Sequence, residues 1–125
     1  MTNYEKVKEF HQKFDVITHT KPTFPDIGTI DLRTGLIEEE LKELYEAIAE
    51  KNIVEVADAL SDLLYVVYGM GDVFGIDLDK TFAEVHRSNM SKLGEDGKPV
   101  RRADGKVLKG NNYSPPNLAP ILNVE

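Results

Sequence analysis

Apolar residues recur at three- and four-residue steps through two stretches of the chain, a spacing typical of amphipathic helices. Prolines and a glycine between residues 21 and 28 separate the two stretches, so we expect a loop there. We predict one helix from residue 2 to about residue 18 and a second from about residue 31 to residue 50. Their apolar positions are Val7, Phe10, Phe14 and Ile17 in the first, and Ile37, Leu41, Leu44 and Ile48 in the second.

The segment from about residue 53 to residue 70 differs because its apolar residues surround nearly the whole helix circumference. We therefore predict a third helix that is buried at the centre of the fold. A fourth helix, capped by Asp79 or Thr81, is expected to run through Phe82 and Val85 towards Leu93. The third helix is too apolar for one short chain to cover, so we also expect a second copy of the chain to pack against it.

Turn-forming residues dominate the chain from Gly94 onward. Asp-Gly-Lys occurs at residues 96–98 and again at residues 104–106, and prolines follow at positions 115, 116 and 120. We interpret this part as turns, one short hairpin and extended segments. The predicted fold is all-α, of four-helix-bundle type, with a helical domain over residues 1–93 and a loop-rich C-terminal tail over residues 94–125 that packs on it.

Composition narrows the classes of function. The chain has 125 residues, the length of one domain, and a formal charge of −7, with 15 lysines and arginines against 22 acidic residues. That balance argues against a nucleic-acid polymer as partner, since phosphate backbones are held by clustered cations. No apolar run is long enough for a membrane span or a secretory signal, and there is no cysteine. We expect a cytoplasmic protein with no membrane partner.

Acidic residues of two neighbouring helices are the strongest chemical signal. Glu40 and Glu43 lie one turn apart on the second helix, and Glu55, Asp58 and Asp62 form one acidic line on the otherwise apolar third helix. These acids are either a solvent-exposed face or a metal site. On the third helix no lysine or arginine is interleaved with the acids, which favours the metal site. Oxygen ligands suit Mg²⁺, with Mn²⁺ possible, and such a cation favours phosphoryl or pyrophosphoryl chemistry.

These residues resemble the motif of a known family. Glu39-Glu40-Leu41-Lys42-Glu43, followed after a spacer by Glu55-Val56-Ala57-Asp58, matches the pattern Glu-Glu-x-x-Glu and Glu-x-x-Asp. The pattern is that of the all-alpha nucleoside triphosphate pyrophosphohydrolases, also called MazG-like, which include the phosphoribosyl-ATP pyrophosphohydrolases. The resemblance implies a homodimer or homotetramer that uses Mg²⁺ to cleave a nucleotide between its α and β phosphates. The products would be a nucleoside monophosphate and pyrophosphate.

Two alignments with the family motif are possible on the third helix. Asp62-Leu63-Leu64-Tyr65 resembles the run that follows the family's metal-binding Asp, but this alignment places Ala59 where the family's Glu stands. The metal ligands are therefore expected among Glu40, Glu43, Glu55, Asp58 and Asp62. Of these, we expect Glu40, Glu43 and Asp58 to be catalytic.

Five further residues are candidates for substrate binding. Arg33 lies two helical turns before Glu40 on nearly the same face, where it could contact a phosphate or pair with an acid. The remaining candidates are Asn89, Lys92, Lys109 and Tyr113. Asn89 and Lys92 resemble residues that relatives place after the fourth helix, and equally fit an ordinary polar helix end. His11 and His19 are interpreted as satisfied core or surface residues.

Two alternative functions remain. One is a non-catalytic helical module that binds a metal or a nucleotide. The other is a haloacid-dehalogenase-type phosphatase, because Asp77-Leu78-Asp79-Lys80-Thr81 resembles the nucleophile loop of that family. That chemistry requires a buried parallel strand before Asp77, and the sequence around it shows no alternation of strands and helices. We interpret the segment as a helix cap.

Overall fold

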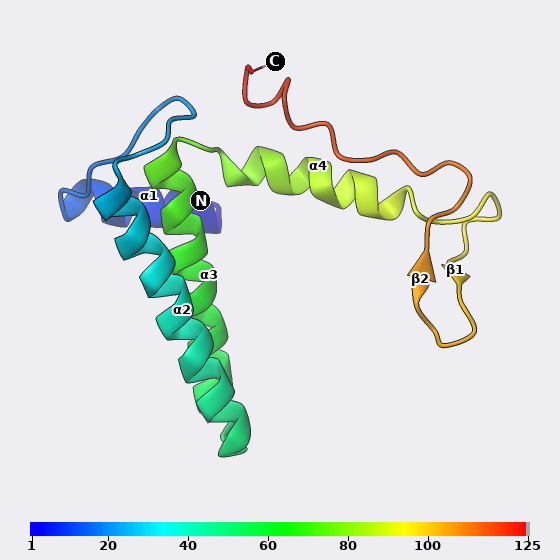
Figure 1. The fold of residues 1–125 in the computed structure, drawn as a ribbon, viewed down its shortest axis with the longest axis horizontal. Helices are drawn as coiled ribbons and strands as arrows, with labels where there is room; N and C mark the ends of the chain where they lie inside the picture. Colours follow the sequence, from blue (N-terminus) through cyan, green and yellow to red (C-terminus); the bar gives the residue numbers. More distant parts are fainter. Residues whose placement is uncertain (125) are drawn as a thin grey trace. The chain divides into compact units, whose positions relative to one another are not determined.

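The computed structural model describes residues 1–124 of the chain. Within them, four helices and one pair of two-residue strands make up the regular structure, which confirms the all-α class (Figure 1). The chain divides into two compact units, Met1–Leu78 and the part from Asp79 onward, and each is described by itself. The elements are α1 (Asn3–Lys13), α2 (Ile27–Ala49), α3 (Ile53–Phe74), α4 (Leu78–Met90), β1 (Val100–Arg101) and β2 (Val107–Leu108).

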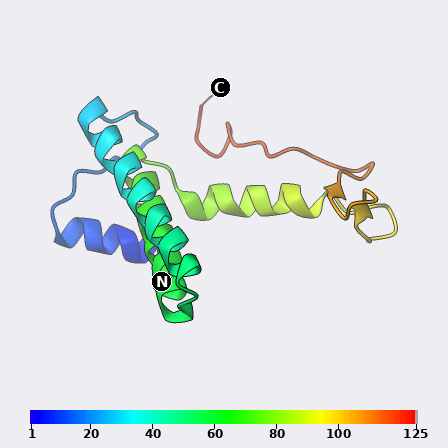
Figure 2. The same cartoon turned by 60° about the horizontal axis from the view of Figure 1, so that its bottom comes forward.

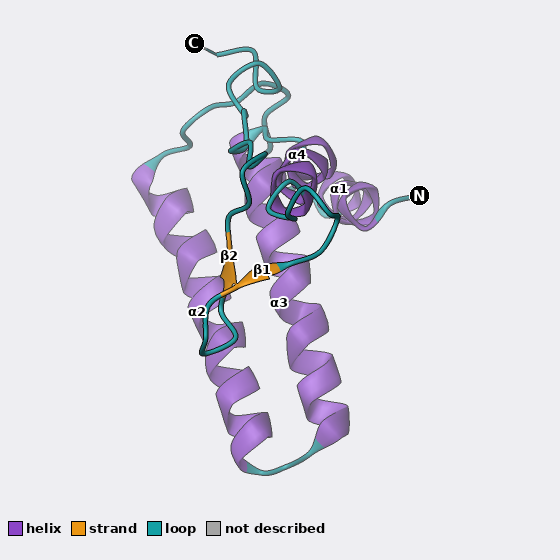
Figure 3. Cartoon of the chain, turned by 90° about the vertical axis from the view of Figure 1, so that its right-hand side faces the viewer, coloured by secondary structure: helices purple, strands orange, loops and turns teal. Residues whose placement is uncertain are grey.

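The first unit is built on an antiparallel pair of long helices. α2 and α3 run side by side and are joined by a short turn at one end (Figure 3). Lys51 makes that turn with a positive φ of 54°, and the Asn52 side chain accepts a hydrogen bond from the Glu55 amide to begin α3. α1 packs against α3 near the other end of the pair (Figure 2). The helix pair is therefore the frame on which any site of this unit is placed.

Capping side chains set the helix ends and explain two differences from the predicted bounds. Asp26 accepts a hydrogen bond from the Thr29 amide, so α2 begins at Ile27 instead of about residue 31. α1 ends at Lys13 instead of residue 18, because Asp15 takes a positive φ of 58°. A capping box between Thr2 and Glu5 begins α1 close to the predicted position.

α3 is central in its contacts, since both α1 and α2 pack on it, but the prediction that it is buried is wrong for the single chain. Leu64 is 55% exposed and Val54 71% exposed. Two helices cover only two sides of a third, and α1 contacts only one part of its length. The buried residues of α3 are Ala59, Gly69, Gly71, Asp72 and Val73. That a second copy covers the rest stays a prediction.

In the second unit, hydrogen bonds tie the tail to α4. Glu84 forms an ion pair with Arg87 and accepts a hydrogen bond from the Asn117 amide, and the Ser114 amide donates to the Ser91 hydroxyl. α4 begins at Leu78, so Asp79 and Thr81 lie within its first turns and the prediction that one of them caps it is wrong.

β1 and β2 pair antiparallel, with Val100 opposite Leu108, and form the expected short hairpin around Gly105. Whether residues 94–125 pack on a helical domain of residues 1–93 stays a prediction. None of the helices described is long and apolar enough to cross a membrane.

Candidate functional site

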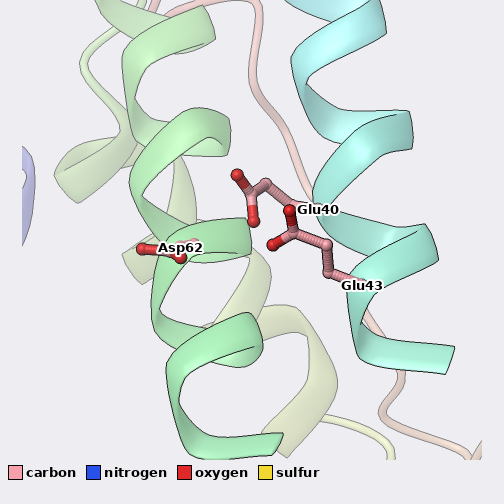
Figure 4. A group of neighbouring side chains, drawn as sticks. All are labelled: Glu40, Glu43 and Asp62. Carbon is pink, nitrogen blue, oxygen red and sulfur yellow. The ribbon is translucent and has the colours of Figure 1, made fainter. Parts of the chain in front are cut away.

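Three carboxylates converge between α2 and α3, and we call them the acidic cluster. Glu40 and Glu43 leave successive turns of α2 on the side of α3, and Asp62 comes from α3 (Figure 4). One carboxylate oxygen from each lies within 4.8 Å of the other two. The helices place them together because Glu40 and Glu43 are three residues apart on one side of α2. Two consecutive helices thus build one site.

The electrostatics of the acidic cluster are unfavourable without a partner. Burial, then a side-chain hydrogen bond with Glu43, and then the charges of Glu43 and Asp62 raise the pKa of Glu40 to about 7. Oε2 of Glu40 is buried and has no hydrogen-bond partner. Within residues 1–124, no lysine or arginine forms an ion pair with any of the three carboxylates. Buried polar atoms are normally satisfied, so this arrangement points to a cation as the missing partner.

The three side chains fit a hard divalent cation. Carboxylate oxygens are the ligands that such ions prefer, and a bound cation would satisfy the orphaned Glu40 oxygen and remove the mutual repulsion. Exposed groups of acids are also found without metal. The buried, unpartnered oxygen is the feature that an ordinary solvent-exposed acidic face lacks. Glu40, Glu43 and Asp62 are therefore the residues that could hold the ion.

The other two predicted acids, Glu55 and Asp58, lie beside the acidic cluster and not within it. Glu55 and Asp58 line an open hollow of about 480 Å³, which we call the acidic hollow, near the α2–α3 turn. Glu43 belongs to both the acidic cluster and the acidic hollow, and Glu46 and Glu50 line the hollow as well. Asp62 lies level with Glu40, whereas Asp58 and Glu55 are one and two turns nearer the hairpin turn.

Arg33 lies at the same helix interface, beyond the acidic cluster. It precedes Glu40 by seven residues and contacts α3 at Gly69, which follows Asp62 by seven residues. Burial lowers the pKa of the Arg33 guanidinium, and the charge of Asp72 opposes that shift. Nε of Arg33 is buried without a hydrogen-bond partner. The structure therefore does not pair Arg33 with a carboxylate of the acidic cluster.

Sequence reasoning missed the surroundings of Arg33. Asp72, which is 1% exposed, accepts hydrogen bonds from Lys8 and from His11 Nδ1, both on α1. We call these three residues the Asp72 network. A lone acid in the apolar run of α3 was the signal that could have revealed it.

The remaining predicted residues belong to the second unit. Asn89 is exposed near the end of α4, and Lys92 is half-buried just beyond it. The Lys109 ammonium lies 4.6 Å from the centre of the Tyr113 ring, a cation–π contact. These residues are placed within their own unit only, so their part in the site stays a prediction.

Comparisons with known proteins relate the chain to nucleotide-hydrolysing enzymes. Residues 7–89 match the family model of phosphoribosyl-ATP pyrophosphohydrolase, a range that contains the whole acidic cluster. An uncharacterized protein of Acanthamoeba polyphaga mimivirus is 40% identical over 102 residues, which are 78% of this chain and 38% of that protein. The chain thus spans less than half the length of that curated relative.

One solved structure also aligns over most of the chain. It is that of a protein from Exiguobacterium sp. 255-15, provisionally named an NTP pyrophosphohydrolase. The alignment covers 98% of this chain and 92% of that chain, with 26% sequence identity and a TM-score of 0.49.

Proposed function

The chain belongs to the phosphoribosyl-ATP pyrophosphohydrolase family, and from this premise we propose that it hydrolyses a nucleoside triphosphate or a similar nucleotide. The bond cleaved is that between the α and β phosphates, and the products are a nucleoside monophosphate and pyrophosphate. The observation that carries this proposal is the convergence of Glu40, Glu43 and Asp62 around a buried oxygen that has no partner.

The cofactor we propose is Mg²⁺, with Mn²⁺ as the alternative. When bound, such an ion polarises phosphate oxygens and lowers the pKa of a water ligand. Glu40, Glu43 and Asp62 would hold it. Glu43 also faces the acidic hollow, where Asp58 and Glu55 are available to orient a water and accept its proton. Our proposed catalytic set therefore remains Glu40, Glu43 and Asp58, with Asp62 as a metal ligand.

Substrate binding is assigned to positive and polar groups outside the acidic cluster. Arg33 lies on the same α2–α3 interface and is proposed to meet a phosphate. The proposed roles of the second-unit candidates, Asn89, Lys92, Lys109 and Tyr113, rest on the sequence alone. We further propose a homodimer or homotetramer, because large apolar side chains of α3 such as Leu64 remain exposed on the single chain.

The non-catalytic alternative rests on the same observation, since a metal or nucleotide could bind at the acidic cluster without turnover. The phosphatase alternative is weaker. The strands among residues 1–124 form one antiparallel pair, and Asp77 precedes a helix instead of following a parallel strand.

A panel of nucleotides with Mg²⁺, scored separately for pyrophosphate and orthophosphate, tests the proposal. We expect the unmodified protein to release pyrophosphate, and Glu43→Gln and Asp58→Asn to lose roughly a hundredfold or more in kcat. Glu38→Gln is the matched control, because Glu38 is an exposed acid of α2 outside the acidic cluster. Its rate should be unchanged.

Three other outcomes would contradict the proposal. Unchanged rates in both Glu43→Gln and Asp58→Asn would exclude the mechanism. Equal affinity for triphosphate and monophosphate with no pyrophosphate released would favour the binding module. Orthophosphate as the product, with dependence on Asp77, would favour the phosphatase.

A further inference from the structure

A second set of polar side chains lies at the α2–α3 interface, two helical turns from the acidic cluster. α1 contributes His11, α2 contributes Arg33, and the two approach α3 at the same point. Arg33 Nη1 and His11 Nε2 each lie 3.3 Å from the position that a Cβ of Gly69 would occupy. Three helices thus bring a guanidinium and an imidazole to one side of a glycine.

The His11 ring is held by Asp72 through one nitrogen only. His11 is 3% exposed, and its Nδ1 lies 2.8 Å from Asp72 Oδ2. An ionised carboxylate only accepts hydrogen bonds, so Nδ1 carries the proton and Nε2 carries the lone pair. Among residues 1–124, Nε2 has no hydrogen-bond partner. The ring is fixed in orientation while its second nitrogen remains available, as in carboxylate–histidine pairs that act on a ligand.

Arg33 is equally incomplete. Its guanidinium offers five N–H donors, and it donates none of them within the part of the chain that the structure describes. The side chain is half-buried, with Nε fully buried. Asp72 accepts its hydrogen bonds from Lys8 at 3.1 Å and from His11 at 2.8 Å, and it acts on Arg33 through its charge alone. A partly desolvated arginine without any acceptor is costly unless an anion completes it.

The local charge agrees with an anionic partner. Two cations, Lys8 and Arg33, act on the single charge of Asp72, Lys8 through an ion pair and Arg33 through its charge alone, so the local balance is positive. The chain as a whole carries −7. A locally positive site in a protein of strongly negative net charge attracts an anion that the rest of the surface repels. A Cβ at Gly69 would lie 3.3 Å from both Arg33 and His11, so a side chain there would press on the two groups.

We propose that Arg33 and His11 form an oxyanion site that takes a phosphate group, with Asp72 as the positioning residue that orients His11. The site lies about 10 Å from the acidic cluster, the rise of seven helical residues. A nucleotide bound by its phosphate chain along the interface would reach both. Only this last assignment, to the distal phosphates of a substrate, rests on the proposed function. The anion site itself stands on the unpartnered Arg33 and His11.

The protonation of His11 is coupled to anion binding in this site. Because Nδ1–H is already donated to Asp72, Nε2 becomes a donor only when it takes up a proton. The facing charged groups are Asp72 from α3, Arg33 from α2 and Lys8 from α1. The protonated ring can then donate Nε2–H to the anion.

Inorganic pyrophosphate, titrated without metal in EDTA and followed by NMR of the histidine rings, tests the site. The absence of metal separates this site from the acidic cluster, and only three histidines need assignment. We expect saturable shifts of the His11 ring resonances, with those of His86 unaffected. Arg33→Gln should weaken pyrophosphate binding roughly tenfold or more.

Two variants and one control separate binding from folding. His11→Asn keeps a donor near the Nδ1 position for Asp72 but removes Nε2, so we expect a folded protein that binds pyrophosphate more weakly. Lys42→Gln removes one exposed charge from the same helix as Arg33 and should bind as the unmodified protein does.

Static His11 resonances during the titration would overturn the proposal, as would unchanged affinity in Arg33→Gln. If Arg33→Gln and Lys42→Gln lost the same affinity for pyrophosphate, binding would be due to general charge attraction, and the proposal would be overturned as well. Binding that persists in a protein without hydrolytic activity would refute the proposed function and leave the anion site standing.

Discussion

Two charged groups on α3 differ in how far the chain itself completes them. Asp72 is buried and receives hydrogen bonds from Lys8 and His11, so its charge and its oxygens are satisfied. Asp62 faces Glu40 and Glu43, two more acids, and the cluster contains a buried oxygen with no partner. A carboxylate that the chain completes is explained by structure, because the hydrogen bonds of Asp72 join α1 to α3. An incomplete carboxylate is explained by a ligand, and variants of the two groups test that distinction.

The largest expected effect is on the completed network. Asp72→Ala leaves His11 and the 40% exposed Lys8 without their common acceptor, and losing hydrogen bonds to a buried charged group costs about 1.5–3 kcal/mol. Chemical denaturation of the metal-free protein should show this loss in the free energy of unfolding. Glu38→Ala, an exposed acid on α2, should change it by less than about 0.5 kcal/mol. If the two variants changed the free energy of unfolding by similar amounts, the Asp72 network would have no special structural role.

The incomplete cluster should behave in the opposite way. Glu40→Gln keeps the shape of the side chain and removes a charge that the chain leaves uncompensated. We expect pyrophosphate release to fall about a hundredfold, with no loss of stability in EDTA. Initial-velocity measurements check the fall in pyrophosphate release, and unfolding curves in EDTA check that stability is not lost. If Glu40→Gln lost its activity only because it unfolds, the acidic cluster would have a structural role, as the Asp72 network has.

Helix periodicity predicted four helices, because the apolar spacing of α1 and α2 is a local property. The helix ends depended on capping. The prolines before Ile27 and the Asp26 cap both act there, and periodicity alone cannot show that the cap starts the helix at once. The burial of α3 was overestimated, because apolarity shows that a surface needs covering and not which chain covers it. Leu64 remains exposed for this reason.

For the site, the sequence indicated the acids but not their grouping. Glu55, Asp58 and Asp62 share one face of α3, so periodicity treats them alike. Which of them is level with Glu40 depends on the length of the turn at Lys51, a three-dimensional property. His11 was expected to be satisfied, and its Nδ1 is hydrogen-bonded. Its free Nε2 depends on α1 crossing α3 at Gly69, which no local pattern encodes.

A smaller expected effect is the dependence of the Mg²⁺ affinity on pH. Glu40 has a pKa raised to about 7, and a cation binds its carboxylate form. Mg²⁺ affinity should therefore rise with pH below 7, by up to about tenfold per unit, and level off above it. Calorimetric titrations from pH 5.5 to 8.5 measure this. In Glu40→Gln the rise should flatten. The same steep rise in that variant would assign the proton to another group.

The smallest expected effect is on the stability of the metal-free protein. The folded pKa of Glu40, about 7, lies above its usual 4.5, so the folded state binds the Glu40 proton more tightly than the unfolded state. This contribution to stability is full below pH 4.5 and is lost as pH rises through 7. At pH 8 in EDTA, Glu40→Gln should therefore be more stable than the unmodified protein, by about 0.5 kcal/mol.

Denaturant unfolding of both proteins at pH 4 and pH 8 checks this last prediction. At pH 4 the advantage of Glu40→Gln should vanish, because the unmodified Glu40 is then protonated as well. Saturating Mg²⁺ at pH 8 should reverse the order, because only the unmodified cluster gains the full binding energy of the ion. If the two proteins keep the same stability in EDTA at both pH values, the acidic cluster is not strained by its own charges. The contrast with the satisfied Asp72 would then no longer indicate where a ligand binds.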